Sequence, residues 1–475
     1  MKLEVLGKDG VARIDQAAGR ILERTGVLVP HQRMLELFRQ AGAQVDMASQ
    51  RVRIPRKLLD DCIRQAGKSF TLYGRDRSIT AAFGQGKRNY NSIAGEASWL
   101  DLDGKRRFAT LDDVVLAAKL GQMLPRLNIV GAMSDPHELD VAYRVVEVVA
   151  AQLRTTTKPL TFWFHDGPSA RFVVEVMAAV SGGQDQLAKF PLAYPFLEPI
   201  SPLRFATWGI DILFETCKLP LPVSIGPMAQ VGMSAPGTLA ATVAQETAEV
   251  LAGLCVVQLI GPGTPVVFGG ICHAFDMRTT QMIFSGPEQG LMAVATTEMG
   301  KHYGLPVYIN VGLTDSKTVD AQAGMECMGS LMMGALGGAD IFGHMGISGV
   351  DQATSLEMLV FQHEVIDYVE RVMRKFAIDD EHLALDLIDE IGPGGAFIDQ
   401  EHTVRHFRNE VWIPTVLDRE YWQQWEAQGR PDTAKRVRQK YHDLMDAYKP
   451  CPLADDVDRE VAKVIASAKR QLTQS

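Results

Sequence analysis

Residues 303–349 contain a complete strand–helix–strand pattern, which restricts more than any other feature how this chain can fold. An apolar run at residues 306–311 leads into the polar turn Asp315-Ser316-Lys317. A helix rich in small residues is predicted over residues 318–336, and a second short strand over residues 339–344. When such strands are parallel, the polar residues that follow them gather at one end of the sheet, where functional sites form.

The same alternation of strand and helix recurs through the middle of the chain. Five further apolar runs are each followed by a helical pattern, namely residues 128–133, 159–165, 192–198, 222–226 and 265–270. An eighth strand is expected at residues 391–397, IGPGGAF. The glycine motif of dinucleotide-binding sheets does not follow the first strand. We therefore predict an α/β fold of the (β/α)8 TIM barrel type.

The segments on either side of the repeat have a different character. Residues 1–110 are predicted to form an N-terminal α/β extension, with helical patterns at 14–25, 30–41 and 56–66 and a β-rich patch at 70–99. Thr110, followed by two acidic residues, is a suitable helix N-cap at the start of the barrel. The barrel domain is placed at 111–400, and residues 401–475 are predicted to form a C-terminal helical region packed outside it.

Composition excludes several classes of function. A formal net charge of −9 provides no basic face for nucleic acid. The longest apolar run, residues 250–260, is too short to cross a bilayer and is interpreted as a buried helix end. The N-terminus lacks the apolar core of a signal peptide, so a cytoplasmic protein is expected. The six cysteines are scattered, and Cys272 and His273, as neighbours on a strand, point to opposite faces, so no metal site is predicted.

Polar and aromatic residues gather at the C-terminal ends of the predicted strands, and no lysine or arginine precedes Lys317 among them. Such a rim suits a cationic or neutral ligand better than a phosphate, because aromatic faces attract quaternary ammonium groups. Each side chain also has a purely structural interpretation: Asp315 as a helix cap, Trp163 as a wall residue, and Glu198 as a buried carboxylate that needs a partner.

Several strings together resemble the trimethylamine methyltransferase superfamily of corrinoid-dependent methyltransferases. They include ILERTGVLVP, RVRIPRKLLDDCI, FTLYGRD, TDSKTVDAQAGMECM, SLEMLVFQHEVIDYV, DEIGPGGAFI and VWIPTVLDRE. The resemblance runs from about residue 10 to residue 450. It implies a barrel that brings a methylated amine to the cobalamin (corrinoid) of a separate corrinoid protein, with no cofactor tightly bound to this chain. The sequence has no pyrrolysine, which places it with the non-pyrrolysine members, whose substrates are quaternary amines such as glycine betaine.

A quaternary amine leaves as a neutral tertiary amine when it loses a methyl group, so its transfer needs orientation and desolvation more than acid–base catalysis. We therefore assign no catalytic residue and expect a cation cage drawn from aromatic and acidic residues. The candidates for the cage are Tyr90, Trp163, Glu198, Asp315 and Phe342. The candidates for binding a substrate carboxylate are Asn91, His165, Asn310 and His344.

Three alternatives stay open at this level. The substrate can be another methylated amine, such as carnitine, proline betaine or a tertiary amine. The chain can be a barrel lyase in which Lys317 forms a Schiff base, provided that Lys317 is desolvated. It can also be a binding protein that senses quaternary amines. A homo-oligomer is expected, with its interface covered by aromatic residues of the C-terminal region: Trp412, Tyr421, Trp422 and Trp425.

Overall fold

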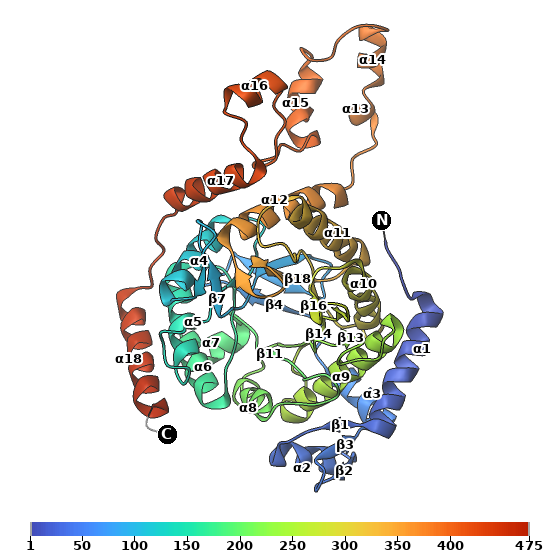
Figure 1. Cartoon of the computed structure of the whole chain (residues 1–475), viewed down its shortest axis with the longest axis vertical. Coiled ribbons are helices and arrows are strands. Elements are labelled where there is room, and N and C mark those ends of the chain that lie inside the picture. Colours follow the sequence, from blue (N-terminus) through green and yellow to red (C-terminus); the bar gives the residue numbers. More distant parts are fainter. Residues whose placement is uncertain (1, 474–475) are drawn as a thin grey trace.

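The computed structural model describes residues 2–473 and has at its centre a curled sheet of parallel strands surrounded by helices (Figure 1). Six strands pair in parallel in the order β11-β12-β14-β17-β18-β6. Their bounds are β6 Asn89–Ser92, β11 Phe196–Leu197, β12 Val223–Ile225, β14 Val266–Gly270, β17 Val307–Asn310 and β18 Ile341–Met345. A second parallel pair consists of β9 (Val130–Gly131) and β10 (Leu160–Thr161).

Backbone contacts link this second pair to both ends of the larger sheet. Asn91 of β6 forms a parallel bridge with Ile129, directly before β9. On the other side, the Leu160 N–H of β10 donates to the carbonyl of Leu192, which lies four residues before β11 (2.9 Å). The strands therefore follow one another around a common centre.

Each of these parallel strands is followed in the chain by a helix that packs on the outside of the sheet (Figure 1). In chain order these are α4 Leu111–Met123, α5 Arg144–Thr155, α6 Gly167–Ser181, α8 Thr207–Thr216, α9 Leu239–Ile260, α10 Pro287–His302, α11 Ala321–Gly337 and α12 Leu356–Met373; the short α7 (Gln184–Lys189) follows α6. The predicted cap is confirmed, because Thr110 and Asp113 form a reciprocal capping box at α4. α9 is long and apolar enough to span a membrane, but it is buried inside the protein and is a core helix.

The predicted eighth strand at residues 391–397 is wrong. α14 (Leu385–Ile391) ends there, and a turn with positive φ at Gly392 and Gly394 follows on the surface. The additional strand of the sheet is β6, which pairs with β18 and precedes the other strands in the chain. β6 has the sequence NYNS and all four residues are buried. It lies in the β-rich patch predicted at residues 70–99, but its polar composition does not mark it as a strand of the central sheet.

The N-terminal segment packs on the outside of the sheet and also covers one of its ends. Its three helices and small sheet pack mainly against α9. These elements are α1 Gly7–Arg20, α2 Gln32–Gln40, α3 Arg56–Gln65, β1 Val27–Leu28, β2 Gln44–Asp46 and β3 Arg51–Arg53. The hairpin of β4 (Phe70–Tyr73) and β5 (Thr80–Phe83) is anchored just ahead of the strands, where the Tyr73 N–H donates to the Pro191 carbonyl (2.8 Å). The hairpin thus covers the N-terminal ends of the strands.

The loops at the C-terminal ends of the strands carry further short strands. One four-stranded sheet, in the order β19-β20-β7-β8, joins the loops that follow β6 and β18: β7 Ser98–Leu100, β8 Arg106–Phe108, β19 Ile347–Ser348 and β20 Ala353–Thr354. A three-stranded sheet joins the loops after β12 and β14: β13 Gln230–Val231, β15 His273–Asp276 and β16 Gln281–Ile283.

The C-terminal region is helical, and only part of it packs on the helices around the sheet. α17 (Thr433–Ala447) contacts α12 and α4, and α18 (Asp455–Leu472) contacts α6 and α5. Between α12 and α17 the chain projects away from the rest of the molecule (Figure 1). The projecting helices are α13 Asp380–Leu383, α14, α15 Glu401–Glu410 and α16 Trp422–Ala427.

Candidate functional site

Four aromatic rings from different strands or strand ends meet inside the curled sheet. The ring of Trp163 lies 5.8 Å from that of Phe196 and 6.4 Å from that of His344. Tyr308 completes the group, with its ring 5.3 Å from Phe196 and 6.2 Å from His344. We call Trp163, Phe196, Tyr308 and His344 the aromatic wall. The Trp163 Nε1–H donates to the carbonyl of Gly95 (2.8 Å), which fixes the indole in place.

His344 reaches this wall because β18 does not keep a regular register. Strand alternation would place His344 on the same face as Phe342, which packs toward the helices. The pairing of β18 with β6 shifts between Phe342 and Met345, and His344 has φ of 74°. This irregularity turns the imidazole inward, where its Nδ1 lies 2.6 Å from the hydroxyl of Tyr308. Burial lowers the pKa of His344 to about 3, so the ring is neutral.

Three acidic side chains share the space around the aromatic wall. They are Glu96 after β6, Glu198 after β11 and Asp351 in the loop after β18, and we call them the carboxylate cluster. The charges of Asp351 and Glu198 contribute to the raised pKa of Glu96, and the charge of Asp351 contributes to that of Glu198. Glu198 and Asp351 also raise the pKa of the Tyr308 hydroxyl. In the described part of the chain, the three carboxylates form neither an ion pair nor a side-chain hydrogen bond, and Oδ1 of Asp351 is a buried atom with no partner.

Burial is the main cause of an unusual charge state in the carboxylate cluster. It raises the pKa of Glu198 to about 7 and that of Asp351 to about 6. The pKa of Glu96 is raised to about 9 by burial together with the charges of Asp351, Asp135 and Glu198. A buried acid without a partner destabilises the fold when it ionises. Such groups are found at sites where a cationic ligand supplies the missing charge.

The loop that carries Asp351 has a strained backbone. Val350 and Asp351 both have positive φ, 60° and 58°. A β-branched residue in this region is costly, of order 1–3 kcal/mol. Strain of this kind is typical of functional loops, and here it fixes the position of Asp351, whose charge contributes to the raised pKa of Tyr308.

His165 belongs to a group beside the carboxylate cluster. Its Nε2 lies 3.3 Å from Oδ1 of Asp135, whose other oxygen accepts from Arg144 (2.7 Å). These contacts lower the pKa of Asp135 although burial opposes them. Asp135 remains ionised and in turn contributes to the raised pKa of Glu96.

The structure brings together four of the residues predicted from the sequence, namely Trp163, Glu198, Asn310 and His344. Asn310 lies on the inner side of β17, and its Oδ1 accepts from the Tyr308 hydroxyl (2.8 Å). Asn91, on β6, has a buried Oδ1 without a hydrogen-bond partner among the described residues.

Three other predicted residues lie elsewhere. Tyr90 and Phe342 contact each other, with ring centroids 5.0 Å apart, and the Tyr90 hydroxyl donates to Glu370 of α12 (2.5 Å). Both rings therefore face the surrounding helices. The expectation that Asp315 caps the next helix is wrong, because Asp320 is the N-cap of α11. Asp315 instead accepts from the N–H groups of Phe284 and Ser285 (3.1 Å each) and ties two loops together.

Sequence reasoning missed Glu96, Asp351, Phe196 and Tyr308. Glu96 follows the strand that was assigned to the N-terminal extension. Asp351 lies in a glycine-containing loop whose inward turn depends on a strained backbone. Phe196 and Tyr308 were included in strands, and the sequence alone does not tell which face of a fully buried parallel strand points to the centre.

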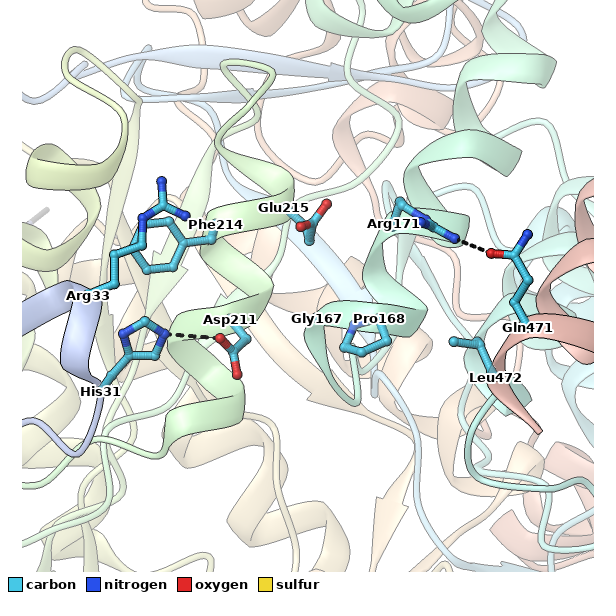
Figure 2. A pocket seen from close by; sticks show the side chains of 10 residues that line it. All are labelled: His31, Arg33, Gly167, Pro168, Arg171, Asp211, Phe214, Glu215, Gln471 and Leu472. Atoms are coloured by element: carbon cyan, nitrogen blue, oxygen red, sulfur yellow. Dashed lines mark hydrogen bonds and ion pairs between the residues drawn. The ribbon is translucent and has the colours of Figure 1, made fainter. Parts of the chain in front are cut away.

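The most voluminous of the described cavities lies outside the sheet and is not suited to a cation. It has a volume of about 620 Å³ and lies between α2, α6, α8 and α18 (Figure 2). The ring of Phe214 in its lining is already covered by the Arg33 guanidinium at 3.9 Å, and Asp211 is paired with His31 (3.0 Å).

A second cavity, of about 400 Å³, lies on the side of the strand C-termini next to the loop of Asp351. Gly349 and Gln352, the near neighbours of Asp351, line it together with Lys317, Arg106 and Arg438. This cavity has a largely apolar lining that carries several charged side chains, and it is adjacent to the carboxylate cluster in the chain.

Comparison with known proteins identifies the relatives of the chain. The family model described as trimethylamine methyltransferase (MTTB) matches residues 1–473. A glycine betaine methyltransferase from Desulfitobacterium hafniense is 29% identical over 99% of this chain and 98% of its own length. A trimethylamine methyltransferase MttB from Methanosarcina barkeri is 26% identical over 99% and 96%. Among solved structures, a monomethylamine methyltransferase (MtmB) from Methanosarcina barkeri aligns with a TM-score of 0.47 and 10% identity over 99% of this chain and 92% of that chain.

Proposed function

Because the chain belongs to the trimethylamine methyltransferase family, we propose that it transfers a methyl group from a small quaternary amine to the cob(I)alamin of a separate corrinoid protein. Glycine betaine or a related betaine is the leading substrate, since a glycine betaine methyltransferase aligns along almost the whole chain. The observation that carries the proposal is the carboxylate cluster facing the aromatic wall, since both kinds of group attract a desolvated cation.

We propose further that the curled sheet is a closed (β/α)8 barrel. The alternation of strands and helices, and the links from β6 to β9 and from β10 to the segment before β11, support closure. The barrel would then begin at β6, inside the segment assigned to residues 1–110, and α12 would be its last helix. The C-terminal domain is proposed to start after α12. A cytoplasmic location fits the six free cysteines.

The proposed mechanism rests on holding and orienting the cation. Glu198 and Asp351 offset the positive charge of the ammonium, and Trp163 and Tyr308 present faces to its methyl groups. The neutral imidazole of His344 adds no repulsion. One methyl group is left pointing out of the site, in line with the bond that breaks. As the amine leaves, it becomes neutral, and the attraction that held the cation is lost, which favours release.

The reduced corrinoid of the partner supplies the nucleophile that accepts the methyl group. Residues around the 400 Å³ cavity suit such a partner, because Arg106, Lys317 and Arg438 offer donors for the amide and phosphate oxygens of a corrinoid. No part of the proposed mechanism requires a cofactor bound permanently to this chain.

A second candidate substrate is a quaternary amine without a carboxylate. In the described residues, no lysine or arginine pairs with the carboxylate cluster, so a betaine carboxylate finds no cationic partner there. A betaine would have to accept a hydrogen bond from a protonated acid, and Glu96 is the member whose raised pKa keeps it protonated at neutral pH. The same acid allows a tertiary amine to be protonated, so tertiary amines also belong among the substrates to test.

The Schiff-base alternative is not supported. Lys317 is exposed, and its Nζ donates to the carbonyl of Asp315 (2.8 Å). A Schiff-base lysine requires a desolvated pocket that holds the amine neutral. The predicted homo-oligomer also stays a proposal; Tyr421 and Trp422, two residues predicted at its interface, are 80% and 67% exposed.

The test is a methyl-transfer assay with reduced cobalamin and a panel of matched amines. Glycine betaine, carnitine, proline betaine, choline, tetramethylammonium and trimethylamine would each be supplied, and the rise of methylcobalamin absorbance recorded. We expect a rise with one or more quaternary amines. A betaine-specific rise supports the leading substrate, and a rise confined to cations without a carboxylate supports the second candidate. No rise with any amine would overturn the proposal, whereas binding without transfer would favour a sensor.

A further inference from the structure

The segment that projects directly after α12 lacks the packing that holds most helices in place. We call residues 376–410, which contain α13, α14 and α15, the arm (Figure 1). The structure describes the whole arm, and none of its three helices contains a buried residue. Helices this short are marginal in water without tertiary packing. The arm therefore needs another source of order.

A cluster of histidine and glutamate side chains joins the two sides of the arm. His402 and His406 are four residues apart on α15, so both rings lie on one face of that helix. Glu381 of α13 lies opposite them, and its Oε1 is 2.9 Å from Nε2 of His406. One ligand atom from each of these three residues lies within 4.8 Å of the others.

A further histidine lies next to this group with its ring already oriented. The ring of His382 is 5.0 Å from that of His406. Its Nδ1 lies 2.6 Å from Oδ1 of Asp379. A carboxylate bonded to one ring nitrogen is the arrangement that fixes the tautomer of metal-binding histidines and leaves the other nitrogen free as a ligand.

We propose that Glu381, His402 and His406 bind one divalent transition-metal ion of the zinc type, with His382 as a further ligand. Imidazole nitrogen and carboxylate oxygen are the usual ligands of such ions when thiolates are absent. The ion would replace the contact between His406 and Glu381 and the bond from His402 to the Glu381 carbonyl. Arg405, which pairs with Glu381, has a second carboxylate in reach at Glu401 (3.2 Å).

The expected effect of the ion is to clip α13 to α15. The ligands are contributed from positions about twenty residues apart in the chain, so one ion closes the loop between them. A metal ligated in the folded arm and not in the disordered one stabilises the folded arm. The sequence shows His402 and His406 at a spacing that suits two ligands on one helix face, but it does not show that Glu381 lies opposite them.

The experiment uses the full-length chain after removal of metal with a chelator. Zinc binding would be measured by calorimetry, and cobalt(II) would be added as a spectroscopic probe of tetrahedral nitrogen and oxygen ligands. We expect one ion per chain, visible absorption bands with cobalt, and slower proteolysis of the arm when zinc is present. Asp379→Ala should weaken binding by about 10- to 100-fold, since it removes the orienting carboxylate.

The double variant His402→Ala/His406→Ala should lose the bands and the protection from proteolysis. His442→Ala, which removes an exposed histidine of α17 outside the cluster, is the matched control and should bind zinc as the unchanged chain does. The arm lies outside the sheet, so the main unfolding transition should stay the same in all variants. Absence of stoichiometric zinc uptake, or full uptake by the double variant, would overturn the proposal.

Discussion

The three members of the carboxylate cluster are unusual because each is half-buried and forms no ion pair or side-chain hydrogen bond with another described residue. A fold under selection for stability alone would pair or replace such groups, since an unpaired buried charge is among the costlier features of a protein. Glu249 shows the ordinary arrangement: it is buried, but it accepts from the Ser201 hydroxyl (2.6 Å) and the Leu203 N–H (2.8 Å). The contrast supports the cation-binding role proposed for the cluster.

Replacing Glu198 by glutamine is expected to weaken substrate binding. The change removes the charge at nearly constant volume, and loss of one partner of a desolvated charge pair costs about 2 kcal/mol or more. KM should rise by about 30-fold or more, since each 1.4 kcal/mol is tenfold. Steady-state methyl transfer would show it, with Glu249→Gln as the control. An unchanged KM for Glu198→Gln would show that this carboxylate does not contact the cation.

The same substitution should make the protein more stable at alkaline pH. The pKa of Glu198 in the folded chain, about 7, lies above its ordinary value near 4.5, so the folded state holds its proton longer than the unfolded state. Stability from this group therefore falls as pH rises from about 4.5 to about 7. Glu198→Gln should recover at most about 3 kcal/mol at pH 8 and almost nothing at pH 4. Denaturant titrations at the two pH values measure the difference; an equal effect at both would contradict the raised pKa.

The candidate site was only partly readable from single residues. Glu198 and Trp163 were found because they end apolar strands next to prolines or between phenylalanines. Asp351 gives no such signal, because its position depends on positive φ at two consecutive residues that are not glycine. Glu96 follows a polar strand. The positions of these two residues are set by tertiary packing that overrides local backbone preference. A sequence pattern does not record such packing.

At the scale of single elements, β18 shows how a strand irregularity shapes the site. Ile341 belongs to the inner core with Tyr308, and Phe342 belongs to the outer core with the helices. The register shift that follows then brings His344 to the inside. The intervening Gly343 makes room for this, because a Cβ there would lie 1.9 Å from the Tyr308 hydroxyl oxygen.

Gly343→Ala is therefore expected to displace Tyr308 and disturb the aromatic wall without changing any charge. Overpacking of this kind costs about 1–3 kcal/mol of stability, and kcat/KM should fall with it. Gly329→Ala is the matched control, because a Cβ at Gly329 on α11 meets no atom within 4 Å. Thermal unfolding and the transfer assay would be run on both. Equal behaviour of the two variants would mean that Tyr308 moves aside without cost.

The sequence predicted the helices more accurately than the strands. Helices with a strong apolar pattern were placed within a few residues, for example α3, predicted at 56–66 and found at Arg56–Gln65. Two strands were predicted wrongly. β6 was assigned to the N-terminal extension, and an eighth strand was expected at residues 391–397, where α14 ends and a turn follows. A buried strand of a closed or curled sheet can be polar when its side chains bond inside, as Asn89 does to the carbonyl of Ala82 (2.8 Å). Hydrophobic periodicity does not detect such a strand.

In the molecule as a whole, the arm and the curled sheet are stabilised by separate sets of contacts. The two ends of the arm lie close together, because Arg374 of the α12 end contacts the carbonyls of Asn409 and Glu410. The sheet has its own continuous cores on its inner and outer faces, to which the helices α13, α14 and α15 contribute nothing.

Excision of residues 376–410, with a short glycine–serine linker in their place, should leave a folded chain. The main unfolding transition is expected to stay within about 1 kcal/mol of the original, since no buried side chain is removed and surface changes rarely exceed about 0.5 kcal/mol each. Denaturant unfolding followed by circular dichroism measures the change, and the amplitude of the helical signal should fall by the contribution of three short helices. Methyl transfer to free cobalamin should persist, because the carboxylate cluster and the aromatic wall lie entirely outside the excised segment. A collapse of the main transition would show that the arm is part of the folding unit, and intact stability with lost transfer would assign the arm a direct role at the strand ends.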